Sequence, residues 1–189
     1  MNTAKPIIIL SLIVAIISAL VIIVYNMTYV DTSGVITSEL SAAITEVYGS
    51  ADGFAVVPAD EWRAVLTEEE FPRITKVVKR ESDGVLAFET VVKGYKDGFD
   101  ILVGVQDGAV AAVSIVSTGE ETPGLGTKTA DPSFLAQFAG ISGEAVVVKT
   151  EPAADNEVQA VTSATFSSKG VAEAVNISLA AYEKCGGAF

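Results

Sequence analysis

The feature that most constrains this sequence is an uncharged apolar run near its start. Residues 7–25, IIILSLIVAIISALVIIVY, contain no charged side chain. A helix of that length spans roughly 28 Å, close to the ~30 Å of a bilayer's hydrocarbon core. Inside lipid, an isolated segment satisfies its backbone polar groups only as a helix. The run therefore predicts a transmembrane helix within an N-terminal anchor, residues 1–30.

A cleaved signal peptide is the alternative, since Lys5 followed by apolar residues also begins many signal peptides. The run is longer than the usual core of about 7–15 residues, and no small-x-small cleavage site follows it. Tyr25 and Tyr29 fit a membrane interface instead. Lys5 precedes the helix and Asp31 follows it. The positive-inside rule therefore predicts a cytoplasmic N-terminus, with the rest of the chain on the outer face.

The titratable residues disfavour several classes of site. The chain has one Cys, no His and a formal net charge of −12. Haem, zinc and iron–sulfur sites supplied by this chain alone are therefore not expected. The acidic balance also disfavours the phosphates of nucleic acid as a partner. Cys185 has no partner for an internal disulfide and is expected to be an inert thiol.

Two units are predicted after the anchor. Residues 31–72 predict a helical lead-in, because apolar residues recur at helical spacing from Leu40 to Tyr48. Gly49 follows at the position of a C-terminal cap. We expect this lead-in to pack on a domain formed by residues 73–189.

Strand and turn signals alternate through the centre of the chain. Apolar runs predict strands at residues 54–57, 74–79, 85–92, 99–106, 109–117 and 145–149. Asp107-Gly108 is a strong two-residue hairpin signal. Apolar residues at helical spacing from Ser167 onward predict a long C-terminal helix that stops at Gly186. The predicted fold is α+β, with a single N-terminal transmembrane helix, an antiparallel-sheet domain and this long C-terminal helix.

The first segment with possible chemistry is EETPGLGTK, residues 120–128. Gly124 and Gly126, on either side of Leu125, permit positive φ and allow backbone to approach a ligand closely. Lys128 offers a cation to an anionic group. An ordinary Pro-Gly turn explains the same residues, and the loop taken alone favours that simpler interpretation.

The second segment is VQAVTSATFSSKG, residues 158–170, which runs into the C-terminal helix. Small and hydroxylated residues crowd the helix start, where unpaired N–H groups and the helix dipole favour an anion. A phosphate there would be held by backbone N–H groups, by Ser167 or Ser168, and by Lys169. The alternative is that Ser167 or Ser168 simply caps the helix, and the segment taken alone favours the cap.

The order of these motifs resembles one known family. After the anchor come KGYKDGFDILVGVQDGAV, ETPGLGTK, DPSFLAQF and TSATFSSKGV. This order is similar to the G subunit of Rnf ion-translocating electron transport complexes. More distantly, it is similar to the C subunit of Na⁺-pumping NADH:quinone reductase. The likeness covers the anchor and is strongest over residues 93–176.

The resemblance implies a covalent flavin. In that family a flavin transferase attaches FMN, through a phosphoester, to the final threonine of a motif resembling S/T-Gly-Ala-Thr, which is Thr165 in this chain. The implied cofactor-binding residues come from the two segments: Glu121, Thr122, Gly124, Leu125, Gly126, Lys128, Thr162, Ser163, Ala164, Ser167, Ser168 and Lys169. The chain departs from the family pattern at Ser163 (usually Gly), Gln159 (often Asp) and Gly119 (often His). No catalytic residue and no metal ligand is expected.

The function implied by the resemblance is electron relay. The chain would be an FMN-carrying subunit of an Rnf-type oxidoreductase complex, anchored in the membrane with its domain on the outer, periplasmic or extracellular, face. Expected partners are other membrane subunits, the flavin transferase and the bilayer around residues 7–25. Two alternatives stay open. One is an independent extracytoplasmic FMN carrier; the other is a flavin-free structural subunit of the same complex, motivated by Gln159 and Ser163.

Overall fold

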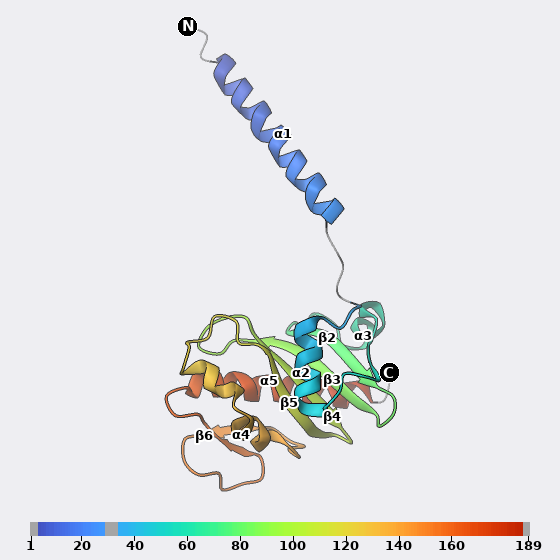
Figure 1. Ribbon diagram of the computed structural model, residues 1–189, viewed down its shortest axis with the longest axis vertical. Helices are drawn as coiled ribbons and strands as arrows, with labels where there is room; N and C mark the ends of the chain where they lie inside the picture. Colours follow the sequence, from blue (N-terminus) through green and yellow to red (C-terminus); the bar gives the residue numbers. More distant parts are fainter. Residues whose placement is uncertain (1–3, 29–33, 187–189) are drawn as a thin grey trace. The chain divides into compact units, whose positions relative to one another are not determined.

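The computed structural model describes residues 4–28 and 34–186 and divides into two compact units, residues 1–32 and 33–189 (Figure 1). The first unit contains one helix, α1 (Ala4–Thr28). Its segment Ile7–Thr28 has a mean hydropathy of 3.4 and buries none of its residues in the protein. By length and composition α1 can cross a membrane, as predicted, although a signal sequence would satisfy the same two criteria.

The second unit is built on a five-stranded antiparallel sheet whose strands lie in sequence order. The strands are β1 (Phe54–Val56), β2 (Ile74–Arg80), β3 (Val85–Val92), β4 (Phe99–Gln106) and β5 (Ala109–Ser117). Each lies within one residue of its predicted bounds. Between β4 and β5, Asp107 and Gly108 have φ of 52° and 78°, the pair of positive values that a tight type I′ turn requires.

Strand β1 joins the predicted lead-in to this sheet, because its three residues pair with β2. The helices of the unit are α2 (Ser38–Tyr48), α3 (Ala59–Val65), α4 (Pro132–Leu135) and α5 (Thr165–Cys185), with short 3₁₀ helices η1 (Gly126–Ala130) and η2 (Ala136–Phe138). The expected C-terminal caps are confirmed, since Gly49 and Gly186 end α2 and α5 in left-handed conformation. The predicted boundary at residue 72 stays a prediction.

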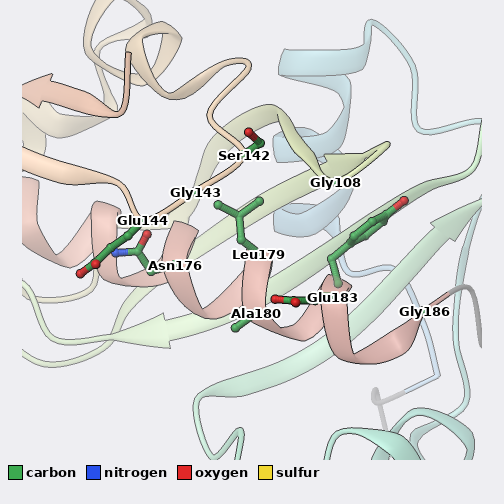
Figure 2. A pocket seen from close by; sticks show the side chains of 10 residues that line it. Gly108, Ser142, Gly143, Glu144, Asn176, Leu179, Ala180, Glu183 and Gly186 are labelled. Atoms are coloured by element: carbon green, nitrogen blue, oxygen red, sulfur yellow. The ribbon is translucent and has the colours of Figure 1, made fainter. Parts of the chain in front are cut away.

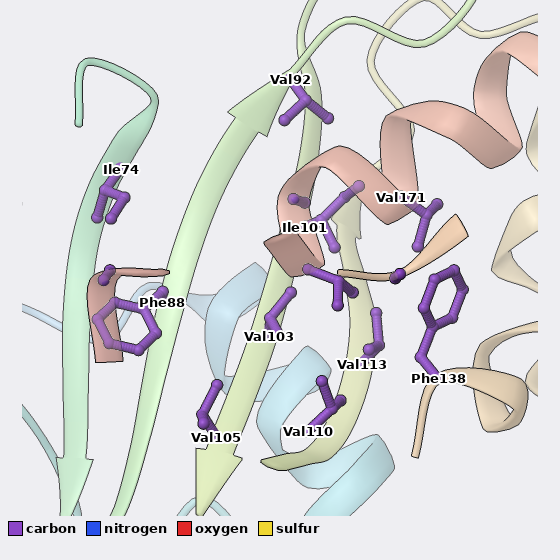
Figure 3. Close-up of a cluster of buried hydrophobic side chains, with 14 of the residues drawn as sticks. Ile74, Phe88, Val92, Ile101, Val103, Val105, Val110, Val113, Phe138 and Val171 are labelled. Carbon is purple, nitrogen blue, oxygen red and sulfur yellow. The ribbon is translucent and has the colours of Figure 1, made fainter. Parts of the chain in front are cut away.

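Helices cover both faces of the sheet, which is why β3 and β4 are buried almost throughout. Alternate strand residues point to opposite faces. Phe88 and Ile101 belong to a large apolar cluster with Val171 of α5 (Figure 3). Ala87 and Leu102, one residue away in each strand, pack instead in a second cluster with α2. This arrangement confirms the α+β class and fixes the start of α5 against the sheet.

Two details of the prediction are wrong. Residues 158 and 159, expected within the loop 158–170, belong to β7 (Glu157–Gln159), which pairs in parallel with β6 (Val146–Val148). Three residues are too short to show alternation, and parallel pairing joins segments that are not neighbours in sequence. Helix α5 also begins at Thr165 rather than at Ser167. Both differences lie in the segment that carries the predicted modification motif.

Candidate cofactor site

The two segments predicted to bind a cofactor meet at one cavity of about 320 Å³, which we call the two-loop pocket. It is lined by Tyr95, Thr122, Leu125, Gly126, Ser163, Ala164, Thr165, Phe166 and Ser167. Seven of these nine residues are among those predicted from the sequence. The volume lies at the lower end of the ~300–1,000 Å³ typical of small-molecule sites.

Two aromatic residues of the pocket were missed by the sequence prediction. Tyr95 precedes β4, and Phe166 follows Thr165 in the first turn of α5. Their ring centroids are 6.5 Å apart, and the two residues are 60% and 68% exposed. Leu125 is 42% exposed beside them. Clustered exposed apolar side chains are typical of a surface that a ligand or partner covers. The sequence signal for Tyr95, an aromatic residue directly after Gly94, was present but weak.

Glycine is required at the two positions of the ETPGLG segment for different structural reasons. Gly124 has a φ of 73°, and its N–H donates to Thr127 Oγ1 over 2.9 Å. Gly126 is needed for close packing, because a Cβ there would lie 1.9 Å from Glu121 Oε2. The Leu125 N–H donates to the Thr122 carbonyl, which closes a turn. The segment is thus a turn, as the simpler interpretation held, and also one wall of a pocket.

Glu121 lies behind that wall rather than in the lining of the pocket. The residue is 4% exposed. Oε1 accepts a hydrogen bond from the Lys96 backbone N–H at 3.0 Å, and Oε2 accepts one from Ser167 Oγ at 2.6 Å. One carboxylate therefore connects three segments that are distant in sequence.

The helix start is not capped by either serine, so the N-cap interpretation is wrong. The cap position belongs to Ala164, whose side chain makes no capping hydrogen bond. Ser167 Oγ donates to Glu121, while Ser168 Oγ donates to the Ala164 carbonyl and accepts from the Val161 N–H. Both hydroxyls lie within the first turn of α5 because the helix begins two residues earlier than predicted.

Ser163 has the backbone conformation of a glycine. Its φ is 65°, one of two positive values among the non-glycine residues that the structure describes. L-residues reach this left-handed region only at an energetic cost, which glycine avoids. The chain departs from the family pattern at this position, and the geometry gives a physical reason for the glycine of that pattern.

Thr165 is the first residue of α5, half-buried at the edge of the two-loop pocket. Within the described residues, its hydroxyl makes no hydrogen bond. The N–H groups of Thr165, Phe166 and Ser167 also donate no hydrogen bond within this part of the chain, whereas the Ser168 N–H bonds to the Ala164 carbonyl. Unpaired N–H groups at a helix start favour an anion.

Five predicted residues besides Glu121 lie outside the pocket lining. They are Gly124, Lys128, Thr162, Ser168 and Lys169. Lys169 lines a separate cavity of about 400 Å³ with Glu173 of the same helix. The structure therefore does not bring either lysine into the two-loop pocket.

A larger cavity, of about 680 Å³, lies along the C-terminal half of α5 (Figure 2). None of its lining residues belongs to the predicted site. Its polar lining includes Glu144, Asn176 and Glu183, and the Asn176 side-chain amide is already engaged with both the N–H and the carbonyl of Ala145. Size alone therefore does not favour this cavity over the two-loop pocket.

A buried charged cluster lies on the α2 side of the sheet. Lys76 Nζ is 3.2 Å from Glu89 Oε2, and Asp100 Oδ1 is buried without a hydrogen-bond partner among the described residues. Burial and the neighbouring charge of Glu89 raise the pKa of Asp100 to about 7. Glu89 and Ala87 point to the same face, opposite to α5, so this cluster is separate from the two-loop pocket.

Comparisons with known proteins agree with this geometry. Residues 94–180 match the family described as FMN-binding domain. The G subunit of the Na⁺-translocating ferredoxin:NAD⁺ oxidoreductase complex of Acetobacterium woodii is 33% identical over 189 aligned residues, covering 92% of this chain and 90% of that protein. The G subunit of the proton-translocating ferredoxin:NAD⁺ oxidoreductase complex of Clostridium ljungdahlii is 40% identical over 84 residues, 44% of this chain and 45% of that protein.

Two solved structures are similar over part of the chain. The C subunit of the Na⁺-translocating NADH-quinone reductase of Parabacteroides distasonis has 26% identity and a TM-score of 0.45, covering 58% of this chain and 60% of that one. NqrC of Shewanella oneidensis has 17% identity and a TM-score of 0.49, covering 75% and 90%. The near-full-length match to the Acetobacterium protein and the FMN-binding domain match show that this chain belongs to the family of Rnf complex G subunits.

Proposed function

We propose that this chain relays electrons in an Rnf-type ferredoxin:NAD⁺ oxidoreductase complex, through FMN joined by a phosphoester to Thr165. The observation that carries the proposal is the difference among five neighbouring hydroxyl groups, those of Thr162, Ser163, Thr165, Ser167 and Ser168. Of these five, Thr165 alone lines the two-loop pocket with a hydroxyl that is unbonded among the described residues and without left-handed backbone strain.

The two serines of the first helical turn are unsuited to a transferase. Both are buried, and both hydroxyls are held in internal hydrogen bonds. Thr162 is exposed but lies outside the pocket lining, and Ser163 sits in a strained left-handed turn. Thr165 is partly exposed, lines the pocket and has no hydrogen-bond partner in the described part of the chain. These differences favour Thr165 as the acceptor.

The surroundings of Thr165 fit both ends of FMN. A phosphate on the first residue of α5 would lie beside the unpaired N–H groups of the helix start, where the dipole favours negative charge. The apolar side chains of Tyr95, Leu125 and Phe166 offer contacts to a flat aromatic ring. No ion pair with a lysine is needed for this fit, so the positions of Lys128 and Lys169 outside the pocket do not count against it.

When bound, FMN would supply the one- and two-electron chemistry, and this chain would supply attachment, position and shielding. A covalent bond suits a domain outside the cell membrane, where lost FMN is not easily replaced. Helix α1 would anchor the chain with its N-terminus in the cytoplasm, as the positive-inside rule predicts. The flavin transferase and the other membrane subunits of the complex are the partners that this proposal requires.

The proposal is tested by Thr165→Val, which keeps the shape of the side chain but lacks the hydroxyl. When the variant is produced in cells that express the transferase, its band on a denaturing gel is expected to lose flavin fluorescence. Its membranes should lose ferredoxin-dependent reduction of NAD⁺ while the complex stays assembled. Thr150→Val, which removes an exposed hydroxyl outside the motif, is the control and should keep both signals. Covalent flavin that persists in Thr165→Val would refute the assignment.

A further inference from the structure

We propose that Glu121 is a positioning residue of the cofactor site: its buried carboxylate ties residues 94–97 to the first turn of α5 and so holds Tyr95 opposite Phe166. This inference rests on the proposed function, because the clamp positions residues of the proposed FMN site. The family resemblance implies direct cofactor contact for Glu121, but its side chain lies outside the lining of the two-loop pocket.

Two hydrogen bonds define the clamp. The Lys96 N–H donates to Oε1 over 3.0 Å, and Ser167 Oγ donates to Oε2 over 2.6 Å. Lys96 directly follows Tyr95, and Ser167 directly follows Phe166. Each pocket aromatic is therefore the sequence neighbour of a residue that is hydrogen-bonded to the carboxylate. Bonds to an ionised acceptor are among the stronger hydrogen bonds in proteins.

Two glycines lie against this carboxylate, and a third lets α5 approach the 94–97 segment. A Cβ at Gly94 would lie 2.3 Å from Oε1, and a Cβ at Gly126 would lie 1.9 Å from Oε2. A Cβ at Gly170 of α5 would meet the Gly94 Cα at 3.2 Å and the Lys93 carbonyl at 3.0 Å. The helix and the 94–97 segment thus approach each other backbone to backbone at Gly170 and Gly94, and the carboxylate bridges them at Ser167 and Lys96.

A buried carboxylate is a costly way to link two segments. Burying a carboxylate costs free energy unless its hydrogen bonds replace those of water, and Glu121 has no ion pair with a lysine or arginine among the described residues. Glu121 is nevertheless only 4% exposed, and its carboxylate is bonded to the two segments that carry the pocket aromatics. Its position is explained if the distance between those segments matters for the ligand.

The test measures amide hydrogen exchange by NMR on the full chain in detergent micelles, in a Thr165→Val background that carries no flavin. Glu121→Ala is expected to speed exchange of the Lys96 amide about 10- to 100-fold, the loss expected for a bond to a charged acceptor. Central amides of the sheet, at Phe88 and Val103, report global unfolding and should change far less. Glu121→Gln is the matched control, because its amide can accept from Lys96 and donate to Ser167. It should stay within about threefold of the background.

A second readout uses the chain with its native Thr165 after treatment with the transferase. The visible circular dichroism of a flavin depends on a fixed environment around its ring. Glu121→Ala should lower that signal at least about twofold at equal flavin content, while Glu121→Gln keeps it. Ser167→Ala, which removes one of the two bonds, covers the case in which Glu121→Ala does not fold. It should raise Lys96 exchange several-fold.

The outcomes separate this inference from the proposed function. Unchanged Lys96 exchange in Glu121→Ala, or in Ser167→Ala where the former does not fold, overturns the clamp even if Thr165 carries FMN. An equal rise at Lys96, Phe88 and Val103 also overturns it, because the effect is then global. If the native chain carries no flavin at all, the proposed function fails, while the exchange measurement still decides whether the clamp exists.

Discussion

Replacing Ser163 with glycine is expected to stabilise the second unit. Ser163 has a φ of 65°, and its side chain makes no hydrogen bond in the described part of the chain that would offset the strain. A non-glycine residue in this region costs about 1–2 kcal/mol. Against this gain, glycine increases the conformational entropy of the unfolded chain, which lowers the free energy of unfolding by about 0.4–1 kcal/mol. The net gain in the free energy of unfolding is about 1 kcal/mol.

The assay is urea unfolding of the full chain, produced without the transferase and held in detergent. Trp62 is the single tryptophan and is 3% exposed, so its fluorescence reports unfolding of the second unit. With a slope of about 1–3 kcal/mol per M of urea, 1 kcal/mol moves the midpoint upward by roughly 0.3–1 M. Ser163→Ala is the control, because alanine has the same steric problem at positive φ and should gain nothing.

Two results would refute this reasoning. A Ser163→Gly midpoint equal to or below that of the wild type would mean that the left-handed turn is not strained. Equal stabilisation by Ser163→Ala would mean that the serine hydroxyl, rather than the backbone, is unfavourable. Either result would also remove backbone strain as the physical reason for the glycine in the family motif.

Three further predictions concern packing, pH dependence and reactivity. Gly126→Ala should destabilise the unit by about 1–3 kcal/mol by driving a Cβ into the Glu121 carboxylate, whereas Gly143→Ala, in open space, should change stability little in the same urea assay. The pKa of Asp100 is raised to about 7, so the folded state binds its proton more tightly than the unfolded state, and stability is lost as pH rises towards 7. Asp100→Asn lacks that loss; its stability relative to the wild type should therefore increase from pH 5 to pH 8, and a constant difference would contradict the burial of this carboxyl. Burial raises the pKa of the Cys185 thiol to about 11, so alkylation by iodoacetamide at pH 8 should be far slower in the folded chain than in urea; similar rates would show the thiol to be accessible.

The sheet was predictable because its signals are local. Each of the five strands is a continuous run of suitable residues, and Asp107-Gly108 specifies its turn within two positions. The glycine caps of α2 and α5 are equally local. Strand β7 was missed because its partner, β6, lies in a separate segment and the pairing leaves no periodic pattern.

The candidate site was only partly predictable. Motif order identifies the two segments that meet at the pocket, and it does so by resemblance rather than by spacing. The roles of Glu121, Tyr95 and Phe166 depend on contacts between segments that the chain brings together only on folding, such as the bond from Lys96 to Glu121 across 25 positions. The positive φ of Ser163 was also not predictable from the sequence, because serine in a loop does not indicate a left-handed conformation.

The most direct test of the central claim is the intact mass of the chain purified from its native membranes, with a peptide map across residues 150–169. We predict a gain equal to FMN less one water, localised to Thr165. An unmodified chain from cells that contain the flavin transferase would contradict covalent attachment, and a flavin-free structural subunit would then be the better account.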